Sequence, residues 1–177
     1  TLILASKFDH CLIEIINKTK NKNLNLSIEA FISNHNDLKK ISSLENLAFY
    51  HFPINNDKLK QEKRIIEFID EKKIDIIILA RYMQILSRNF VDRFYGKIIN
   101  IHHSFLPSFK GAKPYHQAFE RGVKIIGATA HFVNQNLDEG PIIEQDVEKV
   151  DHELSPSDLV TIGKDIEARV LYKAIKN

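Results

Sequence analysis

The side chains best suited to chemistry lie in a histidine-rich stretch, "INIHHSFLPSFKGAKPYH" (99–116), whose start reads as a buried strand. Because side chains on a strand alternate between its two faces, Asn100 and His102 point the same way and His103 points oppositely. An amide can donate a hydrogen bond to a developing oxyanion, and an imidazole can transfer a proton near neutral pH. The Asn-x-His pair therefore predicts acyl chemistry at the end of a strand.

A second polar group lies in "TAHFVNQNLDEGPII" (129–143). His131 is on a strand-like run, and Asp138 follows seven residues later in a loop closed by Gly140 and Pro141. A carboxylate in such a loop could reach His102, fix its tautomer and stabilise its protonated form. The residue types thus favour an enzyme that uses Asn100, His102 and Asp138 without a metal.

Other interpretations of these residues stay open. A histidine at a strand end is often structural. A zinc site could use His102, His103, His116 and His131. However, neighbouring histidines on a strand face opposite ways, and neither His-Glu-x-x-His spacing nor a cysteine pair occurs. Ser104 lacks the Gly-x-Ser-x-Gly turn of a hydrolase nucleophile. The apolar residues of "ARYMQILS" (80–87) could simply fill the core beneath a loop.

Short aliphatic runs alternate with amphipathic segments of helical length through residue 101. The alternation predicts strands at Leu2–Ala5, Leu26–Ser33, Ala48–Phe52, Ile74–Ala80 and Lys97–Ile101. It predicts helices at Asp9–Lys20, Asn36–Ser43, Asp57–Lys72 and Ser87–Phe94, the third capped by Asn56 or Asp57. Such alternation favours an α/β fold with an open, mostly parallel, Rossmann-like sheet and helices on both faces.

The pattern changes after Pro114. A short helix (Tyr115–Gly122) precedes two strand-like runs, 123–133 and 141–150, which are close enough in sequence to form an antiparallel pair at the sheet edge. A last helix begins near Ser155, where Pro156 and Asp158 complete the signature of a capping box. No repeat or linker interrupts the chain, so we expect one domain over residues 1–177.

Composition excludes several classes of protein. The 177-residue chain has a formal net charge of +2, too small to suggest nucleic acid or a membrane surface as partner. A single cysteine, Cys11, fits a reducing compartment and reads as a core residue. No apolar run approaches the roughly 20 residues of a membrane span. No glycine precedes Gly96, so the turn after the first strand lacks a dinucleotide-binding signature.

Residues 99–147, from Asn-x-His through Leu-Pro-Ser-Phe-x-Gly to His-Phe-Val and Asp138, resemble the formyltransferase family that uses 10-formyltetrahydrofolate. The likeness extends upstream through "LARYMQILS", "ISNHNDL" and "SKFDHCL". It implies that Asn100, His102 and Asp138 are catalytic. It also implies a folate pocket between two loops, whose binding and supporting residues are Arg81, Met83, Ile85, Leu86, Thr129, His131, Asn134 and Gln135.

Within this family the chain is most similar to the hydrolytic formyltetrahydrofolate deformylases. Glycinamide ribonucleotide formyltransferases, the alternative, have a Gly/Ser-rich turn for the acceptor's phosphate after the first strand, where this chain has "SKFDHCL". They also usually have His-Pro-Ser in place of His102-His103-Ser104. The resemblance implies hydrolysis of 10-formyltetrahydrofolate by water to formate and tetrahydrofolate, supplying formate for one-carbon and purine metabolism.

The resemblance carries further expectations about the whole protein. We expect no metal and no separate cofactor, because the folate is the substrate. We also expect a cytoplasmic homo-oligomer with no nucleic-acid or membrane partner. Deformylases normally carry an N-terminal regulatory domain of the ACT type, which this chain does not contain. Together with the absence of an initiator Met, this suggests that the sequence is a fragment.

Overall fold

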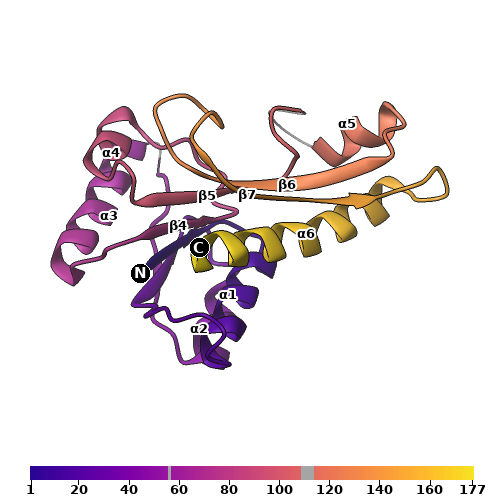
Figure 1. Cartoon of the computed structure of the whole chain (residues 1–177). Helices are drawn as coiled ribbons and strands as arrows, with labels where there is room; N and C mark the ends of the chain where they lie inside the picture. Colours follow the sequence, from indigo (N-terminus) through magenta and orange to yellow (C-terminus); the bar gives the residue numbers. More distant parts are fainter. Residues whose placement is uncertain (56, 109–113) are drawn as a thin grey trace.

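A computed structural model describes residues 1–55, 57–108 and 114–177. Its centre is a seven-stranded sheet in the order β3-β2-β1-β4-β5-β6-β7 (Figure 1). The strands are β1 (Leu2–Ala5), β2 (Ala30–Ser33), β3 (Phe49–His51), β4 (Ile77–Ala80), β5 (Ile98–His102), β6 (Ile125–Phe132) and β7 (Ile142–Lys149). Pairs from β3 through β5 are parallel, whereas β5–β6 and β6–β7 are antiparallel. The expected parallel sheet with an antiparallel C-terminal pair is confirmed.

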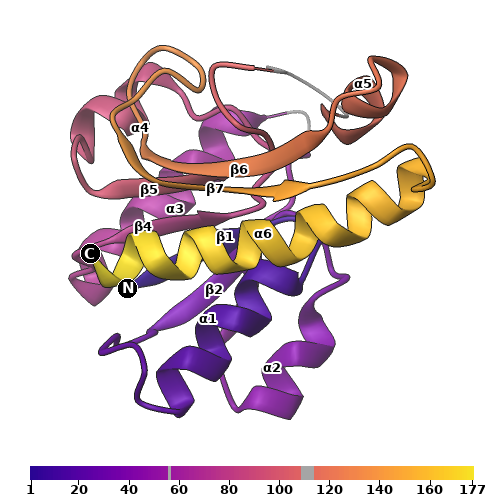
Figure 2. The same ribbon diagram turned by 45° about the vertical axis from the view of Figure 1, so that its right-hand side comes forward.

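Helices cover both faces of this sheet. They are α1 (His10–Lys20), α2 (Lys39–Glu45), α3 (Lys58–Lys72), α4 (Arg88–Arg93), α5 (Pro114–Glu120) and α6 (Pro156–Lys176). Figure 2 shows α6 running along the sheet below β6 and β7, beside α1. Alternation along β4 separates two cores: Ile78 packs with α1 and α6, whereas Ile77 and Leu79 pack with α3 and α4. Both faces are therefore apolar, as the uninterrupted aliphatic runs predict.

Several strands are shorter than their aliphatic runs. The run 26–33 is strand only from Ala30, and the run 74–80 only from Ile77. Both strands flank β1, and each pairs residue by residue with its four residues, Leu2–Ala5. The length of the central strand β1 thus limits the length of its two neighbours, and this length cannot be read from the hydrophobic pattern of the neighbours alone.

Local signals locate the starts of α3 and α6 well, whereas α2 begins at Lys39, three residues after the predicted start at Asn36. The Ser155 hydroxyl accepts from the backbone N–H of Asp158, whose carboxylate accepts from the Ser155 N–H, so the predicted capping box is confirmed. Asp57 caps α3 by accepting from the Lys60 N–H at 2.9 Å, and the alternative cap, Asn56, lies outside the described residues. No helix of the described chain is long and apolar enough to cross a bilayer.

Candidate active site

The site lies where β4, β5 and β6 meet. Asn100 is opposite His131 in the β5–β6 register, and His102 is opposite Thr129. Asn100 and His102 share one face of β5, as strand alternation predicts, and both line the same cavity. The antiparallel register therefore brings His131 beside Asn100, at 3.2 Å between the Asn100 Nδ2 and the His131 Nε2.

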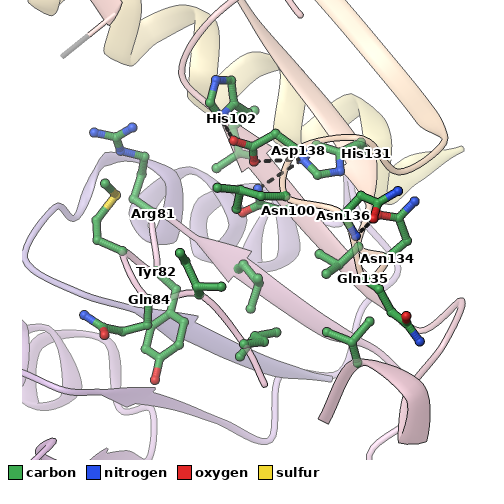
Figure 3. Close-up of a pocket in the computed structure, with 18 of the residues that line it drawn as sticks. Arg81, Tyr82, Gln84, Asn100, His102, His131, Asn134, Gln135, Asn136 and Asp138 are labelled. Atoms are coloured by element: carbon green, nitrogen blue, oxygen red, sulfur yellow. Dashed lines mark hydrogen bonds and ion pairs between the residues drawn. The ribbon is translucent and has the colours of Figure 1, made fainter. Parts of the chain in front are cut away.

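The loop after β6 brings Asp138 to these side chains (Figure 3). Its Oδ2 lies 3.2 Å from the Nδ1 of His102, and its Oδ1 lies 3.7 Å from the Nε2 of His131. Asp138 has a left-handed backbone, with φ of 57°, which is uncommon outside glycine. The three predicted catalytic residues, Asn100, His102 and Asp138, are thus brought together, with His131 as a fourth member.

Electrostatics keep Asp138 ionised. Burial by itself would raise its pKa, but the hydrogen bond from His102 and the nearby ring of His131, whose Nε2 lies 3.7 Å away, lower the pKa below the usual range of an aspartate. The Nδ1 of His131 lies 2.9 Å from the Phe132 carbonyl oxygen, to which it can donate. Its Nε2 can then accept from the Asn100 amide. The Nε2 of His102 is buried and has no hydrogen-bond partner among the described residues.

A cavity of about 490 Å³ opens beside this cluster. Its walls come from the end of β4 and the following loop, the end of β5, and the loop after β6. They are formed by Leu79, Arg81, Tyr82, Met83, Gln84, Ile85, Leu86, Arg88, Val91, Asn100, Ile101, His102, His103, His131, Val133, Asn134, Gln135, Asn136, Leu137 and Asp138. The volume is within the range of small-molecule sites, and the lining combines apolar walls with a few polar groups.

Hydrogen bonds at both ends shape the first wall, residues 81–87. The Met83 N–H donates to the Ser6 hydroxyl at 3.0 Å, and the Ser87 N–H donates to Glu62 at 2.8 Å. Met83 is 50% and Ile85 64% exposed, so neither fills the core. Leu86 lies partly in the core formed with α3 and α4 and partly on the cavity wall. The wall is therefore a pinned loop with apolar side chains at the rim.

The opposite wall, residues 133–138, is held by its own polar side chains. The Asn134 Oδ1 accepts from the Asn136 N–H at 3.0 Å, and its Nδ2 donates to the Glu139 carbonyl at 3.3 Å. The Gln135 amide donates to Asp92 of α4. Asn134 and Gln135 line the cavity, but these contacts give both side chains a role in the loop itself.

Thr129 is the one predicted pocket residue outside the cavity lining. It is fully buried, and its hydroxyl donates to the Ser104 carbonyl at 2.9 Å while accepting from the Leu106 N–H at 3.0 Å. Gln145, on β7, adds a hydrogen bond of 2.9 Å to the same oxygen. Thr129 therefore supports the turn after His102 and His103 and does not face a ligand.

Arg81 follows β4 directly and is paired in an unexpected way. Its Nε lies 3.3 Å from the Oε2 of Glu167, a carboxylate of α6 that is 1% exposed. Glu167 also binds His10 and the Tyr115 hydroxyl, each at 2.8 Å. Burial would raise the pKa of Glu167, but the hydrogen bond from His10 and the charge of Arg81 lower it. Sequence reasoning missed Glu167, although a glutamate on the apolar face of the last helix is a signal of a buried partner.

Within the described residues, one group could offer three ligand atoms to a metal: His10, Cys11 and Glu167, whose atoms lie within 4.8 Å of one another. This site would have to compete with the Arg81 guanidinium for Glu167, and burial raises the pKa of Cys11, which disfavours a thiolate. His102 and His131, from the zinc alternative, instead face Asp138. His116 lies apart from them, on α5.

Known proteins resemble the chain over nearly its whole length. A formyltetrahydrofolate deformylase of Corynebacterium sp. (strain P-1) is 49% identical over 176 residues, which cover 99% of this chain and 62% of that protein. The crystal structure of a formyltetrahydrofolate deformylase from Burkholderia mallei is 49% identical, with a TM-score of 0.94 over 99% of this chain and 63% of that one. The chain spans about three fifths of the length of these relatives.

A relative that is named as a transferase shares the same fold. The crystal structure of a phosphoribosylglycinamide formyltransferase from Anaplasma phagocytophilum is 31% identical, with a TM-score of 0.91 over 99% of this chain and 83% of that one. The family model described as "Formyl transferase" matches residues 1–175. The expected resemblance is confirmed, and the chain belongs to the formyl transferase family.

Proposed function

We propose that this protein hydrolyses 10-formyltetrahydrofolate to formate and tetrahydrofolate. The observation that carries the proposal is the contact of Asp138 with His102 beside Asn100, in the lining of a cavity of about 490 Å³. The deformylase names of relatives that are 49% identical support the same activity. The proposal concerns the reaction of the chain described here, which spans about three fifths of these relatives.

The side chains can divide the reaction between them. The ionised Asp138 holds the Nδ1 of His102 as a donor, which leaves Nε2 free to take a proton from water. The hydroxide forms a bond to the formyl carbon, and the oxyanion accepts a hydrogen bond from the Asn100 amide. His102 returns the proton to N10, the C–N bond breaks, and formate and tetrahydrofolate leave. Water supplies every added atom, so no separate cofactor is needed.

The two cavity loops would bind the pterin. The walls at 81–87 and 133–138 offer backbone polar groups and apolar side chains on opposite sides of the opening. The exposed rim residues Met83 and Ile85 would cover an aromatic ring. Binding of the ring would remove these apolar side chains from water. We assign folate binding to Arg81–Leu86 and to Asn134–Asp138 as continuous walls, with Thr129 in a supporting position.

Formyl transfer to an amine is the second candidate, because a phosphoribosylglycinamide formyltransferase is 31% identical and shares the fold. The two activities separate in one assay of formate and tetrahydrofolate, run with and without glycinamide ribonucleotide. A hydrolase releases formate in buffer that contains only enzyme and 10-formyltetrahydrofolate. Turnover that appears only with the amine would identify a transferase, and folate binding without turnover in both assays would identify a non-catalytic folate-binding module.

The remaining expectations belong to the same proposal. We assign the protein to the cytoplasm. A reducing compartment suits a free thiol such as the buried Cys11. We also assign it a homo-oligomeric state, which sedimentation of the full-length protein would test.

A further inference from the structure

Arg81 occupies a backbone conformation that suits glycine. Its φ is 60°, in the left-handed region, and its side chain is only 9% exposed. A long side chain in this conformation costs energy that glycine would avoid. Contacts of the arginine side chain therefore have to offset the energy of the strained backbone.

The Arg81 guanidinium contacts groups from both ends of the chain. Its Nε lies 3.3 Å from Glu167, and its Cζ lies 5.0 Å from the centre of the Phe8 ring, in the segment between β1 and α1. Lys164 of α6 lies over the same ring, at 5.9 Å. Figure 3 shows Arg81 near His102, with its guanidinium directed away from Asn134 and Gln135. The side chain thus lies on the side of the site opposite the 133–138 wall.

Contacts continue from Glu167 to the catalytic histidine. Glu167 accepts from the Tyr115 hydroxyl at 2.8 Å, the Tyr115 ring lies 6.2 Å from the ring of His103, and His103 lies 5.3 Å from His102. Burial, followed by the Arg81 charge, lowers the pKa of His103 to about 3, so this ring stays neutral and packs beside the cluster. The rings of His103 and Tyr115 therefore pack in succession beside His102.

The cavity is correspondingly one-sided. Its lining comes from residues 79–91, 100–103 and 131–138, and it includes no residue of β1, α1 or α6. The Ser6 hydroxyl, at the end of β1, is already bonded to Asn34 and to the Met83 N–H. A transferase must hold two substrates that meet at one carbon, whereas the described lining of this cavity leaves the side of β1 and α6 to Arg81 and its partners.

We infer that the Arg81 side chain, held by Glu167 and Phe8, determines specificity by occupying the volume through which an amine acceptor would approach the formyl carbon. This inference rests on the proposed hydrolysis. An attacking amine must come within about 3.5 Å of the carbon with the rest of its molecule behind it. Water needs only its own volume, so the filled side leaves hydrolysis as the reaction.

The test compares the fate of the formyl group in the full-length protein. Wild type and Arg81→Gly are incubated with 10-formyltetrahydrofolate and glycinamide, and both formate and formylglycinamide are measured. Removing the side chain also relieves its backbone, so the ratio of formylglycinamide to formate should rise about tenfold, the usual scale for admitting a larger group to a pocket. The matched control is Lys73→Gly, which removes another long cation at a positive φ of 51°, at the end of α3.

A second variant keeps the test decisive if Arg81→Gly does not fold. Phe8→Ala removes the ring beside the guanidinium and should raise the same ratio, whereas Phe119→Ala, at 43% exposure against 41% for Phe8, should not. An unchanged ratio in the folded variants, or ready formylation of glycinamide by wild type, would overturn the inference. Wild type that releases no formate would instead overturn the proposed function.

Discussion

At the scale of single residues, Asn100 has one amide proton to spare. Its NH₂ group carries two donors, and within the described chain one of them is engaged, by the His131 Nε2 at 3.2 Å. The second donor is available for an oxyanion. We expect Asn100→Ala to lower kcat by about 10²–10³ with little change in KM, because the contact strengthens only as charge develops.

Steady-state kinetics of 10-formyltetrahydrofolate hydrolysis check this prediction. Asn25→Ala, at an exposed position outside the site, is the control and should leave both constants unchanged. A rise in KM with an unchanged kcat would mean that Asn100 binds the ground state and does not stabilise an oxyanion.

Asp138 acts through His102, so its charge matters more than its shape. Asp138→Asn keeps the side-chain volume but removes the anion that faces Nδ1 of His102 at 3.2 Å. We expect kcat to fall by about 10²–10⁴, the usual range for acid–base catalysis. His102→Ala should add little to the loss in the double variant, since the two groups work as one unit. Additive losses would show that they act separately; Asp75→Asn, at an exposed site, is the control.

Strand alternation predicts that Asn100 and His102 share a face, and the family resemblance indicates Asp138. Neither predicts that His131 would lie between Asn100 and Asp138, because that contact depends on the β5–β6 register. The family resemblance predicts Arg81 on the cavity wall, but it does not predict the pairing of Arg81 with Glu167, 86 positions later. Local patterns do not contain contacts between distant elements.

At the scale of elements, α6 and α5 meet through a glycine. A Cβ on Gly163 would overlap the Tyr115 ring, so α6 can approach α5 only with glycine there. Tyr115 in turn donates to Glu167, one turn further along α6. The amphipathic pattern and the capping box predict α6, but they do not explain a glycine in its interior, since that glycine depends on its neighbour.

We expect Gly163→Ala to destabilise the protein by about 1–3 kcal/mol, as overpacking does. This outcome opposes helix propensity, which favours alanine by about 1 kcal/mol. Urea unfolding of wild type and variant measures the difference. In a Tyr115→Ala background the overlap is absent, so the same change should become neutral or stabilising. A stabilising Gly163→Ala in the presence of Tyr115 would show that the ring can move away.

At the scale of the whole molecule, buried charge links the C-terminal helix to the turns after β1 and β4. Glu167 contacts His10, Arg81 and Tyr115, which belong to three other parts of the chain. Two ionised carboxylates, Asp138 and Glu167, have pKa values lowered by such partners despite burial. Alternation of strands and helices predicts the sheet that supports these contacts, whereas the contacts themselves arise only when the elements pack.

These carboxylates make stability sensitive to acid. A group whose pKa is lower in the folded state contributes stability above its unfolded pKa of about 4 and loses it as the pH falls through the folded value. Replacing Glu167 by Gln leaves Arg81 buried without its anion, so the variant should be less stable at pH 7 by about 3–5 kcal/mol. Because the unfolded wild-type chain binds the proton of Glu167 before the folded chain does, the difference should shrink as the pH falls below about 5 and through the lowered pKa of Glu167. Urea unfolding at each pH, with the exposed Glu153→Gln as control, measures it, and a constant difference would mean that the charge of Glu167 is not what stabilises the fold.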